Sequence, residues 1–275
     1  MTVIGTNVSA LRASNASTMA SNALSTSIQR LSTGKRINSA KDDAAGLAIS
    51  NSMTAQIRGM NQGVRNANDG ISMAQTAEGA LDEVGNMLQR MRELAVQNAN
   101  GTYSSTDTAN IVSEQKALAS QINSVLTNTK FNGLGLFDGS AGSSGTVSIQ
   151  AGANSGDAVS VKFTKLTDNT SITGIIGATP GTTAPSEVLS DYDTAINTIS
   201  TSRAGLGAAQ NQLQSAVNNL TSNTTNLTDA QSRITDTDFS TESTALAKAQ
   251  ILSQASTAML AQANQSQQNV LSLLK

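Results

Sequence analysis

Residues 192–234 read "YDTAINTISTSRAGLGAAQNQLQSAVNNLTSNTTNLTDAQSRI" and carry a large apolar side chain at every seventh position. A small residue stands three positions after each of the first six. A seven-residue repeat with this internal step is typical of a helix that packs along its whole length against other helices. Large side chains opposite small ones also let neighbouring helices approach closely. The repeat comprises Tyr192, Ile199, Leu206, Leu213, Leu220, Leu227 and Ile234.

A second apolar stripe runs from Met53 to Ala95 in steps of three and four residues. Its mean period is close to 3.5, the spacing of a supercoiled helix rather than of an isolated surface helix. A shorter stripe between Ile111 and Val125 ends at a turn in "FNGLGLF", residues 131–137. Both prolines lie outside these stripes, as uninterrupted helices require. The predicted fold class is mainly α: a long antiparallel helical bundle, or coiled coil, formed by N- and C-terminal segments.

The segment between the helical halves has a different texture. Residues 147–151 and 159–163 alternate apolar and polar side chains, with "GANSGD" between them, which predicts a small β-hairpin. Residues 166–186 are rich in threonine, glycine and proline. We expect them to form a short exposed tip.

The two ends of the chain have helical periodicity but little apolar surface, because alanine and serine fill half of each stripe. Such helices bury too little alone to offset the entropy of ordering them. We therefore expect both ends to be disordered in a free monomer and to fold against each other and against neighbouring subunits. The stripes are Ala13, Ala16, Ala20, Leu24, Ile28 and Leu31 at one end, and Ala249, Leu252, Ser256, Met259, Ala263, Ser266, Val270 and Leu273 at the other.

Composition argues against several classes of function. The chain contains no histidine and no cysteine. It therefore lacks the usual proton shuttle, thiolate nucleophiles and the commonest metal ligands. We expect that it is not an enzyme and that it binds no metal or cofactor. A net charge of -2 and the lack of a basic stripe argue against nucleic acid and membrane binding. The N-terminus lacks the pattern of a cleaved secretory signal. The protein therefore either stays inside the cell or leaves by a route that does not read that signal.

The stretch "INSAKDDAAGLAIS", residues 37–50, gathers charges in a chain where charges are sparse. Lys41, Asp42 and Asp43 permit two interpretations, a catalytic lysine–carboxylate cluster or the start of a helix. Ser39 and Asp42 have the spacing of a capping box, and acidic residues suit the first turn of a helix, which favours the second. By the same argument, Asp238 or Ser240 begins the last helix, with Phe239 packing beside it.

Several long stretches of the chain resemble bacterial flagellins. The N-terminal half contributes "IQRLSTGKRINSAKDDAAGLAIS", "RNANDGISMAQTAEGALDEVGNMLQRMRELAVQNANGT" and "TKFNGLGLF". The C-terminal half contributes "LGAAQNQLQSAVNNL", "NLTDAQSRITDTDFSTESTALAKAQIL" and "QASTAMLAQANQSQQNVLSLL", and "IQAGANSGDAVSV" resembles the family's hairpin. The resemblance covers nearly the whole chain except residues 166–186. The large central domains of longer flagellins are missing.

The resemblance implies an extracellular subunit that polymerises into the flagellar filament for swimming motility. Such a subunit is exported unfolded through the flagellar type III channel. Its partners would be further copies of itself, the cap protein, hook–filament junction proteins and an export chaperone. In this family residues 1–45 and 235–275 would form a terminal coiled-coil inner core, residues 46–140 and 187–234 a helical outer core, and residues 141–186 the hairpin and tip. A hook–filament junction protein of the same superfamily is the alternative.

Two groups of site residues follow. Those expected to serve subunit assembly are Leu24, Ile28, Leu31, Ser39, Lys41, Asp42, Asp43, Leu252, Met259, Val270 and Leu273. The resemblance also implies a patch that a vertebrate Toll-like receptor reads, at positions that could equally make contacts between subunits. The matching residues are Gln89, Arg90, Glu93, Leu94, Gln97 and Glu114.

Overall fold

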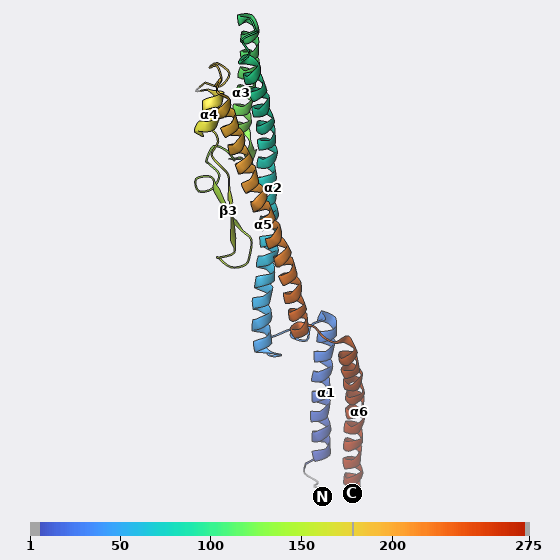
Figure 1. Ribbon diagram of the computed structural model, residues 1–275. Helices are drawn as coiled ribbons and strands as arrows, with labels where there is room; N and C mark the ends of the chain where they lie inside the picture. Colours follow the sequence, from blue (N-terminus) through green and yellow to red (C-terminus); the bar gives the residue numbers. More distant parts are fainter. Residues whose placement is uncertain (1–5, 178, 273–275) are drawn as a thin grey trace. The chain divides into compact units, whose positions relative to one another are not determined.

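The computed structural model describes residues 6–177 and 179–272, with side chains described as far as residue 266. The predicted fold class is confirmed: long helices dominate, with two short two-stranded sheets between them (Figure 1). No helix in the described ranges combines the length and apolar character needed to cross a lipid bilayer. The elements are α1 (Val8–Thr33), α2 (Ala44–Asn98), α3 (Ser105–Asn128), β1 (Lys130–Phe131), β2 (Leu134–Gly135), β3 (Thr146–Gln150), β4 (Ala158–Lys162), α4 (Thr170–Ile176), α5 (Leu189–Thr235) and α6 (Phe239–Ser272).

The chain divides into two compact units, and the divisions fall within α2 and α5. One unit comprises Met1–Ala55 and Asn226–Lys275, and the other comprises Gln56–Thr225. The predicted division into an inner core, an outer core and a tip, with disordered ends in the monomer, stays a prediction.

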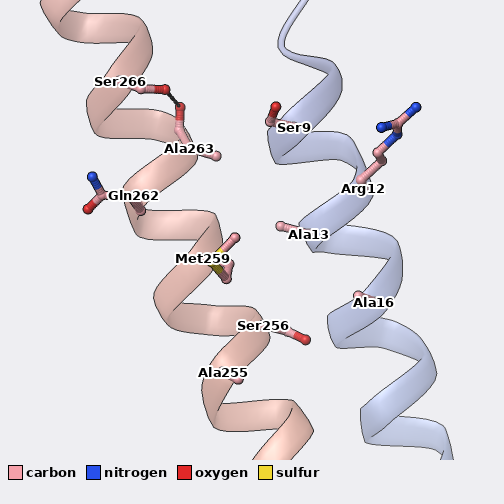
Figure 2. Close-up of a pocket in the computed structure, with 10 residues that line it drawn as sticks. All are labelled: Ser9, Arg12, Ala13, Ala16, Ala255, Ser256, Met259, Gln262, Ala263 and Ser266. Carbon is pink, nitrogen blue, oxygen red and sulfur yellow. Dashed lines mark hydrogen bonds between the residues drawn. The ribbon is translucent and has the colours of Figure 1, made fainter.

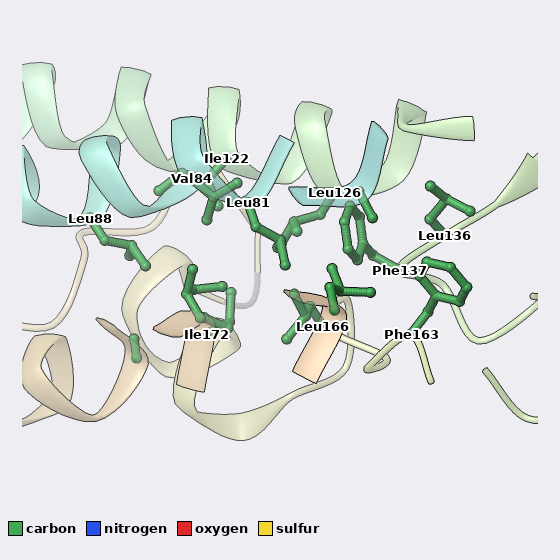
Figure 3. Close-up of a cluster of buried hydrophobic side chains, with 14 of the residues drawn as sticks. Leu81, Val84, Leu88, Ile122, Leu126, Leu136, Phe137, Phe163, Leu166 and Ile172 are labelled. Atoms are coloured by element: carbon green, nitrogen blue, oxygen red, sulfur yellow. The ribbon is translucent and has the colours of Figure 1, made fainter. Parts of the chain in front are cut away.

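The second unit contains the main core, in which the two sequence stripes meet. Figure 3 shows the part of this core where residues of α2 and α3 lie near Leu136, Phe163 and Ile172. From Tyr192 to Leu220 every seventh residue of α5 is buried, whereas Leu227 in the other unit is only half-buried. The α2 stripe is buried from Ala67 to Ala95, except for the half-buried Ile71. Both stripes meet aliphatic residues of α3, so the long helices are held by side-chain packing rather than by helix propensity.

The β3–β4 hairpin agrees with the predicted strands, with Val147 opposite Val161 and Ile149 opposite Val159. It lies directly on α2, and the Asn66 side chain donates a hydrogen bond to the Gln150 carbonyl at 3.0 Å. Gly63 makes this approach possible, because a Cβ there would lie 2.8 Å from the backbone nitrogen of Gly152.

The segment expected to be an exposed tip differs from that expectation. Residues 170–176 form α4, and its side chains Ile172, Ile175 and Ile176 are buried in the core against α3. Leu166, just before the helix, is buried as well. Isoleucines at steps of three and four give even this short segment an apolar face, so its general composition was misleading. Residues 179–188 after the helix have no regular structure.

Candidate assembly surface

Helices α1 and α6 run side by side and antiparallel (Figure 1). Near one end, Asn7 donates a hydrogen bond to the Ala263 carbonyl at 3.0 Å, and near the other, Arg30 and Glu242 form an ion pair at 3.6 Å. The buried and half-buried side chains of both helices recur in steps of three and four, and we call them the α1–α6 seam. Its members are Ala10, Ala13, Ser17, Ala20, Leu24, Ser27, Arg30 and Leu31 on α1, and Glu242, Ser243, Leu246, Ala249, Ser253, Ser256, Leu260 and Ala263 on α6.

The seam is offset in places from the stripes expected from the sequence. On α1, Ser27 is buried where Ile28 was expected. On α6, the half-buried Ser253 and Leu260 stand where the stripe placed Leu252 and Met259. Small side chains let the two backbones approach closely, and this close packing moves the larger neighbours to the flank.

The flanking residues are consequently open to solvent in the single chain. Ile28 is 51% exposed, Leu252 48% and Met259 64%. Leu24 and Leu31, also expected at the assembly surface, are half-buried in the seam. Leu273 and the side chain of Val270 lie outside the described residues.

Three of the exposed apolar side chains, Met19, Leu252 and Met259, border two hollows between α1 and α6. One, of about 480 Å³, is lined by Ala13, Ala16 and Met259 among others, and Figure 2 shows the Met259 side chain on the side of α6 that faces α1. The second, of about 470 Å³, includes Met19 and Leu252 in its lining. The exposed large apolar residues of the two helices are Val8, Leu11, Met19, Ile28, Phe239, Ile251, Leu252 and Met259.

The connection between α1 and α2 is a hydrogen-bonded turn that ends at the start of α2, as the helix-start interpretation expected. Asp42 Oδ2 accepts hydrogen bonds from the backbone nitrogens of Asn38 and Ser39 and from the Ser39 hydroxyl, at 2.8–3.1 Å. The expected capping box is only half formed: Asp42 accepts from the Ser39 backbone nitrogen, but the Ser39 hydroxyl donates to Asp42 instead of accepting from its backbone. Asp43 caps α2 by accepting from the Gly46 nitrogen at 2.8 Å. Among the described residues no carboxylate lies within ion-pair distance of Lys41.

The start of the last helix follows the expectation in part. Asp238 accepts from the backbone nitrogen of Ser240 at 2.9 Å, so it is the N-cap of α6. Phe239 does not pack beside it, however, because its side chain is exposed. In the first turn of α6 the buried position is occupied by Glu242 instead, and Phe239 lies on the exposed side.

Arg36 joins the segment between α1 and α2 to the end of α5, a role that the sequence did not suggest. Its Nη2 donates to the Ile234 carbonyl at 2.8 Å, and its backbone nitrogen donates to the Thr235 carbonyl at 2.7 Å. The Thr237 nitrogen donates back to the Gly34 carbonyl at 3.0 Å. A guanidinium at the C-terminal end of a helix satisfies free carbonyls and opposes the negative end of the dipole.

Gln231 is a second residue that sequence reasoning missed. Its amide nitrogen donates to the Thr54 hydroxyl at 2.6 Å and to the carbonyl and hydroxyl of Ser50 at 3.2 Å. Ser50 is buried, so this amide satisfies a polar group that would otherwise lack a partner. The bond therefore fixes the end of α5 against the beginning of α2.

The receptor-patch positions come together on α2 and α3, with one exception. Arg90 forms ion pairs with Glu93 at 3.1 Å and with Glu114 at 3.0 Å. The hydrogen bonds that Arg90 donates in these pairs, first of all those to Glu114, raise the pKa of Arg90. Gln89 and Gln97 are exposed beside them. Leu94 is buried in the core, so its side chain is not available to a partner.

The acidic groups of this chain act as hydrogen-bond acceptors at turns and helix starts. The pKa of Asp42 is lowered, chiefly by the backbone hydrogen bond from Ser39. The pKa of Asp238 is lowered in the same direction by the Thr241 hydroxyl. Within the described ranges no group of three or more His, Cys, Asp or Glu side chains is placed to hold a metal ion. The arrangement supports packing and capping.

Comparison with known proteins places both ends of the chain in one family. Residues 4–142 match the bacterial flagellin N-terminal helical region, and residues 189–274 match the bacterial flagellin C-terminal helical region. The chain is 44% identical over 251 residues to a flagellin of Halalkalibacterium halodurans, covering 90% of each. It is 40% identical over 313 aligned residues to a flagellin of Xenorhabdus nematophila, covering 99% of each.

Among solved structures, the crystal structure of Bacillus cereus flagellin is similar at 29% identity. The match covers 59% of this chain and 88% of that chain, with a TM-score of 0.41. The family assignment therefore rests on the sequence matches, which span both helical regions and almost the full length of two flagellins. This chain belongs to the bacterial flagellin family.

Proposed function

We propose that this chain is the structural subunit of a bacterial flagellar filament, and that copies assemble through the faces of α1 and α6 outside their seam. One observation carries the second part: α1 and α6 leave their large apolar side chains, such as Leu11, Ile28 and Leu252, open to solvent. Apolar side chains gathered along a single pair of helices indicate a surface that a protein partner covers. In a filament subunit that partner is a second copy of the chain.

The weakness of the seam supports the same conclusion. Positions such as Ala20, Ser27, Ala249 and Ser256 contribute few methylene groups, each of which stabilises by only about 0.8 kcal/mol when buried. The pair therefore gains much of its stability when neighbouring copies bury the flanking leucines and methionines, so folding and assembly are coupled. Identical contacts that repeat without closing a ring produce a helical polymer.

The finer steps of the pathway are part of this proposal. The chain is exported unfolded through the flagellar type III channel with the help of a chaperone, and it polymerises outside the cell beneath a cap protein, on hook–filament junction proteins. Weak terminal helices support such a route, because little free energy is needed to keep them unfolded during export. The role is structural and requires no cofactor.

For the patch around Arg90 we propose assembly as the main role, with recognition by a Toll-like receptor as a secondary one. Arg90, Glu93 and Glu114 are about half exposed, so either partner can reach them. Surface ion pairs of this kind contribute little to folding, because water and salt screen them. Their charges are therefore free to serve binding without a large cost to the fold.

The test is seeded polymerisation of the purified chain, viewed by electron microscopy. We expect short filament seeds to elongate in the full-length chain. A variant that lacks residues 240–275 should keep the α-helical circular dichroism of the Gln56–Thr225 unit but add nothing to the seeds. A full-length chain that never elongates seeds would refute the filament role. Normal elongation by the truncated chain would refute the assembly role of α6.

A further inference from the structure

The methionines of this chain are sorted by exposure. The chain contains eight, and among the described ones two are largely exposed: Met19 at 72% and Met259 at 64%. Both lie on the terminal pair, one on α1 and one on α6. In contrast, Met73 and Met91 are buried in the core of the other unit. The most exposed thioethers therefore lie on the helices through which we propose that the subunit assembles.

Each exposed methionine also borders one of the two hollows between α1 and α6. Met259 lines the hollow near Ala13 and Ala16 (Figure 2), and Met19 lines the one that includes Leu252. Neither residue belongs to the α1–α6 seam. A chemical change at these sulfurs would therefore act on largely exposed side chains at the border of the two hollows, not on the buried positions of the seam.

Resting on the proposed function, we infer that Met19 and Met259 form an oxidation site at which a hydroperoxide blocks assembly of free subunits. The thioether sulfur attacks one oxygen of the peroxide, the O–O bond breaks, and an S–O bond forms. The sulfur loses two electrons and becomes a sulfoxide, and hydrogen peroxide is reduced to water. An apolar, adaptable side chain thereby becomes a polar one that is costly to bury between subunits.

Free and assembled subunits should differ in their sensitivity to peroxide. A subunit that has not yet assembled presents both thioethers to solvent. In the filament, neighbouring copies would cover the same faces and exclude peroxide. Oxidation therefore acts on the free subunits and spares those already assembled, so growth stops while existing filaments persist.

The first measurement is a time course with hydrogen peroxide, followed by peptide mass mapping of the full chain. In the monomer, Met19 and Met259 should be oxidised at least tenfold faster than the buried Met73 and Met91. In filaments, oxidation of the first two should slow by a similar factor. Equal rates at exposed and buried methionines in the monomer, or no slowing in the filament, would overturn the inference.

The second measurement is seeded elongation. Oxidised chain should elongate at least tenfold more slowly than untreated chain, and treatment with methionine sulfoxide reductases for both epimers should restore it. The double variant Met19→Leu with Met259→Leu, which keeps the side chains apolar, should elongate equally before and after peroxide. The control Met73→Leu should remain sensitive.

The outcomes separate this inference from the proposed function. If untreated chain does not elongate seeds, the filament role itself fails, and the inference fails with it. If untreated chain elongates and chain oxidised at Met19 and Met259 elongates as fast, only the inference fails. Persistent peroxide sensitivity in the double leucine variant, or no rescue by the reductases, also overturns it, since the damage then lies elsewhere.

Discussion

Arg36 Nη2 donates a hydrogen bond to the carbonyl of Ile234 at 2.8 Å, although the two residues are 198 positions apart in the chain. This contact ties the segment after α1 to the last turn of α5. Together with the reciprocal backbone bonds of Arg36, Thr235, Gly34 and Thr237, it makes the entry to α2 and the exit from α5 one hydrogen-bonded element. The terminal helices α1 and α6 therefore share one hydrogen-bonded base at the end of α5.

Replacing this guanidinium should loosen that base. In Arg36→Ala, we expect the backbone amide hydrogens at position 36 and at Thr237 to exchange about fivefold faster than in the unsubstituted chain. The reason is that one capping contact contributes about 1 kcal/mol. Arg36→Lys should fall between the two, because it keeps the charge but not the planar fork. Hydrogen exchange read by NMR measures this. Unchanged exchange in Arg36→Ala would show that the backbone bonds suffice alone.

Two glycines of α2 should respond in opposite directions to alanine. A Cβ at Gly63 would lie 2.8 Å from a backbone nitrogen of the hairpin, so Gly63→Ala should destabilise the chain by about 1–3 kcal/mol. At Gly79 nothing lies within 4 Å of such a Cβ, and Gly79→Ala should stabilise by about 1 kcal/mol through helix propensity. Urea unfolding of both variants compares them directly. A stabilising Gly63→Ala would mean that the hairpin does not press on α2.

The phenol of Tyr192 should make stability fall at high pH. Burial raises its pKa to about 12, above the ordinary value of 10.0, and the hydroxyl donates to the Ser186 carbonyl at 2.8 Å. The unfolded chain releases this proton first, so the stabilisation is complete below pH 10 and is lost between pH 10 and about 12. The chain has only two tyrosines. In Tyr103→Phe, phenolate absorbance therefore reports Tyr192 alone, and titration near pH 10 in the folded chain would contradict the account.

Leu252 should matter to the filament and not to the monomer. Because its side chain is about half exposed, Leu252→Gln should change the free energy of unfolding by less than about 0.5 kcal/mol. Burying a leucine contributes about 1.5–3 kcal/mol, so the critical concentration for polymerisation should rise at least about tenfold. Leu252→Met is the matched control and should polymerise normally. A large loss of monomer stability in Leu252→Gln would instead place this residue in the fold of the single chain.

The sequence was informative where its repeats are long. The seven-residue steps from Tyr192 and the stripe that ends at Ala95 predicted which faces of α5 and α2 are buried, since a long repeat of large residues allows only one facing side. The β3–β4 hairpin was predictable for a similar reason, because alternation assigns each side chain to a face.

Other features were beyond the reach of such patterns. In α1 and α6, alanine and serine occupy neighbouring positions, so the sequence pattern hardly distinguishes one buried face from the face one residue away, as with Ile28 and Ser27. How closely the backbones pack decides which of the two is buried. The role of Arg36 depends on a partner nearly two hundred residues away, and no local signal announces it. The buried α4 could have been found from Ile172, Ile175 and Ile176, whose spacing is helical.

The central claim is that copies of the chain cover the faces of α1 and α6 outside their seam. An electron-microscopic image reconstruction of the filament, with side-chain density, tests it most directly. The account predicts that Ile28 and Leu252 lie buried against neighbouring subunits while Ala20 and Ala249 still pack within one chain. A filament in which Ile28 and Leu252 remain open to solvent would contradict it.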